Sequence, residues 1–268
     1  MTLVSIDGIS VGYDDVGTGE PLVLIHGHPF NRSMWRPQVE HASRTGWRVI
    51  APDLRGYGES TVVPGATPLA TFAGDIANLL DHLDVDRIVL GGLSMGGQIV
   101  LEFYRLFPDR IRGLLLADTF AQAETEDGKR VRNDMADRLI REGMGGYSDE
   151  VLPKMLASAN IQTQPAVADD VMTMMRGTAP DGAAAALRGR AERPDYVDLL
   201  ARITVPTLVV VGEQDEFTPV RDAEFMHFRI PNSVLAVIAG AAHMPNLERP
   251  HEFNDVLDRF LTSVHTSA

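Results

Sequence analysis

The chain has 268 residues, of which 44% are apolar, so it can bury the core of one α/β domain that carries an insertion. Its formal net charge of −13 argues against a nucleic-acid partner, because phosphate binding requires a basic face. The absence of cysteine excludes disulfides and thiolate metal sites. We find no signal-like segment and no apolar run long enough for a membrane span, and therefore expect a cytoplasmic protein without a membrane partner.

The first residues have the pattern of a β-hairpin, with alternating side chains on both sides of Asp7-Gly8. Apolar runs of strand length follow, several of them apolar throughout, as in parallel strands that are covered on both faces. These runs are 22–26, 48–51, 87–90, 111–117, 207–211 and 234–238. Between and after these runs, apolar residues over 67–83 and 253–261 recur at the spacing of a helix. The order predicts an α/β protein with a mostly parallel, doubly wound sheet and an antiparallel amino-terminal hairpin.

Residues 119–202 contain helical patterns and no convincing strand. Pro165 suits the first turn of a helix, and Ser148 is a candidate cap for a helix over 151–157. We predict that 119–202 form a helical lid inserted between two strands, and that 1–118 and 203–268 form the α/β core.

The segment Gly92-Leu93-Ser94-Met95-Gly96 fits the pattern G-x-S-x-G, in which a serine occupies a sharp turn between a strand and a helix. The bend crowds the residues two before and two after the serine, so only glycine fits there. The helix that follows directs its free N–H groups to the place where an oxyanion would form. The motif predicts Ser94 as a catalytic nucleophile.

A serine needs a base, and the base needs an acid that orients it. In this chain order the acid should follow a later strand and the histidine should follow the last one. Asp215 comes after the strand predicted over 207–211, and Glu213 and Asp118 are alternative acids. His243 comes after the last predicted strand. Because catalytic groups gather at the carboxyl ends of parallel strands, we predict His243 as the base and Asp215 as its partner.

The loop His26-Gly27-His28-Pro29 follows the first buried strand, where a second oxyanion donor is needed. We predict that the backbone N–H groups of His28 and Met95 hold the oxyanion, and that the His26 ring hydrogen-bonds within the loop. Three phenylalanines each follow a strand end and are candidates for substrate binding, with core packing as the alternative: Phe30, Phe120 and Phe217.

Together these motifs resemble the α/β-hydrolase superfamily over nearly the whole chain. The segment Asp53-Leu54-Arg55-Gly56-Tyr57-Gly58-Glu59-Ser60 is similar to the structural D-x-R-G-x-G-x-S loop of that family. The most similar branch comprises small serine esterases, enzymes like 3-oxoadipate enol-lactonase, and cofactor-free perhydrolases of the haloperoxidase type. Position 28 is often a large apolar residue in this branch, whereas here it is histidine. The resemblance implies the α/β-hydrolase fold.

The residues and the resemblance favour a serine hydrolase that cleaves a small carboxylic ester or lactone through an acyl-enzyme. We expect neither a metal nor an organic cofactor. Two alternatives stay open: a perhydrolase, in which peroxide replaces water, and a ligand receptor on a hydrolase scaffold with little turnover. The sequence does not specify the substrate or the oligomeric state.

Overall fold

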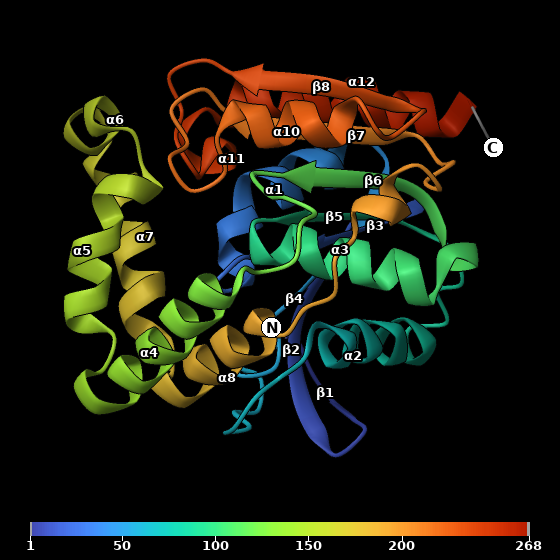
Figure 1. The fold of residues 1–268 in the computed structure, drawn as a ribbon. Coiled ribbons are helices and arrows are strands. Elements are labelled where there is room, and N and C mark those ends of the chain that lie inside the picture. Colours follow the sequence, from blue (N-terminus) through green and yellow to red (C-terminus); the bar gives the residue numbers. More distant parts are fainter. Residues whose placement is uncertain (1, 267–268) are drawn as a thin grey trace.

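A computed structural model describes residues 2–266 and contains one eight-stranded sheet with the order β1-β2-β4-β3-β5-β6-β7-β8 (Figure 1). The strands are β1 (Thr2–Ile6), β2 (Ile9–Val16), β3 (Glu20–Ile25), β4 (Trp47–Pro52), β5 (Ile88–Leu93), β6 (Ile111–Ala117), β7 (Thr207–Gly212) and β8 (Ser233–Ile238). The pairs β1–β2 and β2–β4 are antiparallel, and all other neighbours are parallel. The predicted fold class is confirmed.

The amino-terminal hairpin turns at Asp7 and Gly8, where Ile6 pairs with Ile9. Both turn residues have positive φ, 47° and 80°, as a two-residue type I′ turn requires. Aspartate tolerates this conformation and glycine favours it, which is why the Asp-Gly signal predicts the hairpin correctly.

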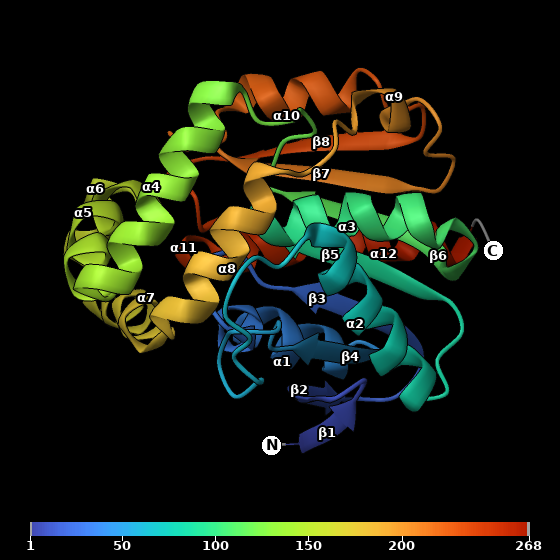
Figure 2. The same ribbon diagram turned by 60° about the horizontal axis from the view of Figure 1, so that its bottom comes forward.

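The central strands carry apolar side chains at consecutive positions because successive side chains enter different cores. In β3, Val23 and Ile25 join one buried cluster, whereas Leu22 and Leu24 join the other. The first cluster is covered by α2 (Leu69–His82), α3 (Met95–Leu106) and α10 (Val220–His227). The second is covered by α1 (Arg36–Arg44) and α12 (Pro250–Thr266). Helices therefore cover both faces of the sheet (Figure 2).

A helical insertion lies between β6 and β7, at the end of the sheet to which the arrowheads of β6 and β8 point (Figure 1). It consists of α4 (Glu126–Glu142), α5 (Gly145–Met155), α6 (Ser158–Thr163), α7 (Pro165–Gly177) and α8 (Pro180–Ala191). Short helices complete the described part of the chain: α9 (Val197–Leu200), α11 (Pro245–Glu248), and 3-10 turns at Arg32–Trp35 and Pro108–Arg110. Between residues 2 and 266, no helix is both long and apolar enough to cross a membrane.

The start of α5 differs from the sequence prediction. Ser148 does not cap a helix, because α5 already begins at Gly145 and continues through Ser148. The buried hydroxyl of Ser148 donates to the carbonyl of Met144, one turn back, at 2.7 Å. A serine that is satisfied in this way does not interrupt a helix. Pro165 is the first residue of α7, as predicted.

Candidate active site

Ser94 is the single residue between β5 and α3, and its backbone has φ 58° and ψ −115°. A residue with a side chain rarely adopts this strained conformation. The flanking glycines permit the turn: a Cβ on Gly92 would lie 2.4 Å from the carbonyl of Gly96, and one on Gly96 would lie 2.3 Å from the oxygen of Ile25. The Ser94 N–H donates to the carbonyl of Ala117 in β6 at 2.9 Å, which anchors the turn to the sheet.

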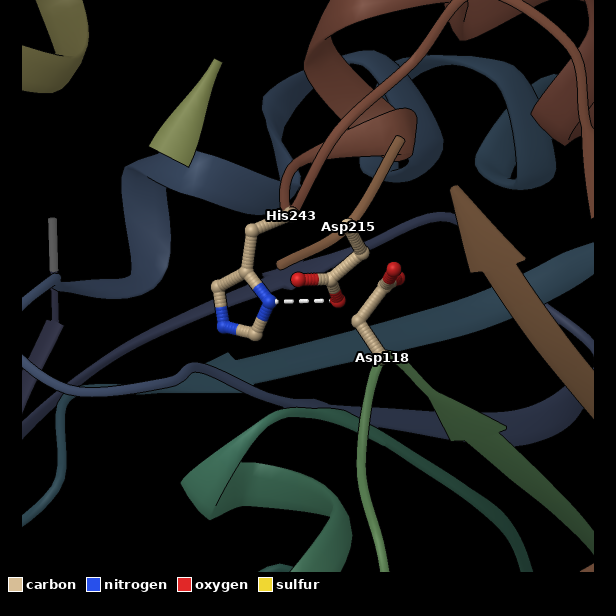
Figure 3. A group of neighbouring side chains, drawn as sticks. All are labelled: Asp118, Asp215 and His243. Carbon is tan, nitrogen blue, oxygen red and sulfur yellow. Dashed lines mark hydrogen bonds and ion pairs between the residues drawn. The ribbon is translucent and has the colours of Figure 1, made fainter. Parts of the chain in front are cut away.

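His243 and Asp215 form a buried pair in the loops that follow β8 and β7 (Figure 3). His243 Nδ1 lies 2.7 Å from Asp215 Oδ2, and the two residues are 2% and 4% exposed. The other Asp215 oxygen accepts from the backbone N–H groups of Phe217 at 2.8 Å and Thr218 at 3.2 Å. The Thr218 hydroxyl donates to Oδ2. The carboxylate is therefore held in one orientation against the imidazole.

The surroundings of Asp215 fix its ionisation state. Burial works to raise the pKa of Asp215, but the charge and hydrogen bond of His243 and the hydrogen bonds of Thr218 outweigh it and leave the pKa below its ordinary value. An ionised Asp215 can only accept, so His243 Nδ1 carries the proton that they share. In the neutral ring, Nε2 is then free to accept a proton, as a general base must.

The two alternative acids have other contacts. Asp118, at the end of β6, accepts from the Gly212 N–H at 2.9 Å through one oxygen, and its other oxygen is buried without a hydrogen-bond partner in the described chain. Burial, followed by the negative charge of Asp215, raises the pKa of Asp118 well above its ordinary value. Glu213 accepts from the Gly240 N–H at 3.0 Å. Asp215 is thus the carboxylate that orients His243.

Asp118, Asp215 and His243 bring ligand atoms within 4.8 Å of one another, so this group could hold a metal ion (Figure 3). A metal bound to all three would replace the hydrogen bond between Asp215 and His243. The existing bonds, which leave His243 Nε2 as an acceptor, favour proton transfer at this position.

The predicted oxyanion loop runs beside Ser94. A Cβ on Gly27 would lie 2.9 Å from the Leu93 oxygen and 3.4 Å from the Ser94 Cβ, so glycine is needed for this approach. His26 is fully buried, and its Nδ1–H donates to the Gly27 carbonyl at 2.9 Å, while its Nε2 accepts from the Leu54 N–H at 2.9 Å. The internal hydrogen bond predicted for His26 is confirmed.

Met95 is the first residue of α3, so its N–H has no carbonyl partner within the helix and lies at the positive end of the helix dipole. His28 follows Gly27 in the loop and is joined to Pro29 by a cis peptide bond. The roles of these two N–H groups as oxyanion donors stay predictions.

Ser94 and His243 line one cavity of about 130 Å³, although 148 positions separate them in the chain. His28 and Thr218 line it from the neighbouring loops. The insertion contributes five of its lining residues: Arg132, Tyr147, Met155, Leu187 and Arg190. A cavity this small favours a small acyl or alcohol group.

The three candidate phenylalanines have different places. Phe120 and Phe217 line the cavity with Ser94. Phe30 does not belong to the described lining; it is fully buried in the apolar core beneath α1 and α12. Packing in the core is the role that this position favours.

The sequence reasoning did not single out Arg132, Tyr147 or Arg190. The sequence around Arg190 gives a weak indication of its burial, because 183–191 consist mostly of small residues, which allow a helix to pack closely. The positions of Arg132 and Tyr147 depend on how α4 and α5 fold over the sheet, which local patterns do not reveal.

The fold and the paired Asp215 and His243 define a protein of hydrolase architecture. A family model described as the alpha/beta hydrolase family matches residues 22–256, and the chain belongs to this family. It is similar to the structure of a thermophilic esterase from Thermogutta terrifontis with malate bound, at 40% identity and TM-score 0.97, covering 99% of this chain and 100% of that one.

Two curated relatives have different activities in their names. The chain is 32% identical to 3-oxoadipate enol-lactonase 1 of Acinetobacter baylyi over 242 residues, which cover 87% of this chain and 85% of the lactonase. It is 29% identical to a putative non-heme chloroperoxidase of Synechocystis over 266 residues, which cover 94% and 95% of the two chains. The chain is therefore an α/β hydrolase close to esterases, enol-lactonases and chloroperoxidases.

Proposed function

We propose that this protein is a serine hydrolase that cleaves small carboxylic esters or lactones through an acyl-enzyme. One observation carries the proposal: Ser94, on its strained turn, lines the same cavity as His243, whose Nδ1 is held by Asp215. The similarity to an esterase and an enol-lactonase supports the same reaction class.

In the proposed mechanism, His243 Nε2 takes the proton of the Ser94 hydroxyl as its oxygen attacks the substrate carbonyl. Asp215 stabilises the imidazolium that forms. The N–H groups of His28 and Met95 donate to the oxyanion of the tetrahedral intermediate. His243 then gives its proton to the leaving alcohol, and a water molecule releases the acyl group by the same steps. The mechanism requires neither a metal nor an organic cofactor.

Steady-state rates on 4-nitrophenyl esters of increasing acyl length, beside a panel of small lactones, test this proposal. Ser94→Ala should lower kcat by at least about 10⁴-fold, because the nucleophile is lost. Ser5→Ala is the matched control: Ser5 is exposed in β1, and its variant should retain the full rate. Equal rates in the wild type and Ser94→Ala would reject Ser94 as the nucleophile. One turnover followed by no further product would favour a ligand receptor.

The relationship to a putative chloroperoxidase favours perhydrolysis as a second candidate. Hydrogen peroxide would then attack the acyl-enzyme in place of water and release a peroxyacid. Measuring peroxyacid and acid formed from one ester in the presence of peroxide separates the two. A product that is mainly acid at millimolar peroxide supports hydrolysis.

A further inference from the structure

Two arginines of the insertion line the cavity that contains Ser94. Arg132 lies on α4 and Arg190 near the end of α8, and these helices pack along each other beside the carboxyl ends of the strands (Figure 2). Guanidinium groups are strong, directional donors to carboxylates. Their presence in a cavity otherwise suited to a small acyl group requires an explanation.

Arg190 is 7% exposed, and no carboxylate of the described chain forms an ion pair with it. Its Nε donates to the amide oxygen of Gln98 at 3.0 Å. Gln98 lies one turn after Ser94 in α3, so this bond holds the guanidinium close to the nucleophile turn. The two terminal nitrogens of Arg190 form no hydrogen bond with residues 2–266. A buried cation without a counter-charge is unfavourable unless something supplies one.

The neighbouring charges increase this imbalance. Arg193, whose side chain is fully buried, donates to Glu124 at 3.0 Å, and Arg132 donates to the same oxygen of Glu124. The Glu124 carboxylate thus pairs with two guanidinium groups, and no carboxylate of the described chain pairs with Arg190. Burial, followed by the charges of Arg132 and Arg193, lowers the pKa of Arg190 well below its ordinary value. Because arginine keeps its proton in proteins, an anion bound beside Arg190 would stabilise its buried charge.

His28 adds a neutral donor. Its Nδ1 lies 2.8 Å from the hydroxyl of Tyr57, which burial keeps protonated by raising its pKa. Burial, followed by the charges of Arg190 and Arg132, lowers the pKa of His28 well below its ordinary value, so the ring is neutral. If the Tyr57 hydroxyl donates to Nδ1, the ring proton lies on Nε2. This Nε2 is buried without a partner among the described residues, in a ring that lines the cavity.

We propose that the substrate carries a second, free carboxylate, and that Arg190 binds it with the assistance of Arg132 and His28. The substrate class is then a short monoester or lactone of a dicarboxylic acid. This inference rests on the proposed function, since it places the anion in the cavity where the ester would be cleaved. The side chains of the insertion, rather than the sheet, would set the specificity.

A matched pair of ligands tests the anion site: monoethyl succinate, which carries the carboxylate, and ethyl succinamate, in which a neutral amide replaces it. We expect kcat/KM for the acid to exceed that for the amide about ten- to hundredfold, the range of one charge-assisted hydrogen bond. In Arg190→Gln this ratio should fall close to one, and in Arg132→Gln it should fall partway. Because the ratio compares two substrates on one protein, a general disturbance of the fold does not change it.

Arg138→Gln is the control for loss of a positive charge from α4. Arg138 bonds Glu142 and Glu150 on the outside of the insertion and does not belong to the described lining. Its variant should keep the full preference for the acid. Equal kcat/KM values for acid and amide in the wild type, or an unchanged ratio in Arg190→Gln, would overturn the inference and leave Arg190 a packing residue.

Calorimetric titration of Ser94→Ala with the same two ligands separates this inference from the proposed function, because binding then requires no turnover. Tighter binding of the acid by tenfold or more, lost in the double variant with Arg190→Gln, supports the anion site even if no ester is hydrolysed. Equal binding of both ligands overturns the anion site, even if neutral nitrophenyl esters are good substrates.

Discussion

Glu248 joins the insertion to the loop that carries His243. The residue is 1% exposed, and one carboxylate oxygen accepts from the Ala157 N–H at 2.7 Å and the Asn160 amide at 2.6 Å. The other oxygen accepts from the Ala242 N–H at 2.7 Å, directly before His243. All three partners donate, so only a group with two acceptor oxygens satisfies them.

Glu248→Gln replaces one of these oxygens by an NH₂ group. If the amide oxygen keeps the bond to Ala242, the NH₂ group opposes the donors of Ala157 and Asn160, and two hydrogen bonds to a charged group are lost. Each such bond contributes about 1.5–3 kcal/mol, so the free energy of unfolding should fall by about 3–6 kcal/mol.

Urea unfolding followed by tryptophan fluorescence measures this change, since both tryptophans of the chain, Trp35 and Trp47, are buried. Glu224→Gln, at an exposed position of α10, is the control and should change the free energy by no more than about 0.5 kcal/mol. A loss below about 1 kcal/mol in Glu248→Gln would refute the view that this carboxylate connects the two segments.

Three further predictions concern the acid, the nucleophile turn and a buried histidine. Asp215→Asn should lower kcat by about 10⁴-fold, because an amide can neither hold the His243 tautomer nor stabilise the imidazolium. Asp118→Asn should lower kcat less than about tenfold, since an amide oxygen can still accept from the Gly212 N–H and the raised pKa of Asp118 favours the uncharged carboxyl that the amide resembles; steady-state kinetics compares the two variants. Gly92→Ala should abolish soluble expression, because its Cβ would lie 2.4 Å from backbone atoms. Gly74→Ala, within α2 and with no atom in the way, should instead raise the free energy of unfolding by about 0.4–1 kcal/mol. The pKa of His28 in the folded protein lies below its unfolded value of 6.5. The free energy of unfolding therefore keeps its full value above pH 6.5, and it decreases at lower pH because His28 is protonated in the unfolded chain. His28→Gln should therefore reduce the slope of unfolding free energy against pH below about 6.5 by about 1.4 kcal/mol per unit; an unchanged slope in urea titrations would contradict this.

The parts of the fold that local patterns determine were predictable. The run 111–117 is β6 residue for residue, because a strand covered on both faces is apolar at nearly every position, and in β6 only the half-buried Arg112 is charged. The turn at Ser94 was predictable because close backbone contacts leave only glycine at positions 92 and 96. Both features depend on neighbours in sequence or on contacts that the motif itself encodes.

Features that depend on packing between distant segments were not predictable. The sequence offered Glu213 and Asp118 beside Asp215 as acids, and only the 2.7 Å contact with His243 distinguishes them. The predicted start of α5 was wrong because the buried hydroxyl of Ser148 donates to a carbonyl inside the helix and does not cap it. The positive charge of Arg190 in the cavity was missed because no local pattern indicates which arginines lose their contact with water.

The central claim is that Ser94 becomes covalently acylated, and mass spectrometry of the protein after reaction with a fluorophosphonate tests it most directly. We expect one adduct, on the peptide that contains Ser94, formed rapidly by the wild type, slowly by Asp215→Asn and not at all by Ser94→Ala. A wild-type protein that stays unmodified, or an adduct on a different residue, would contradict the account.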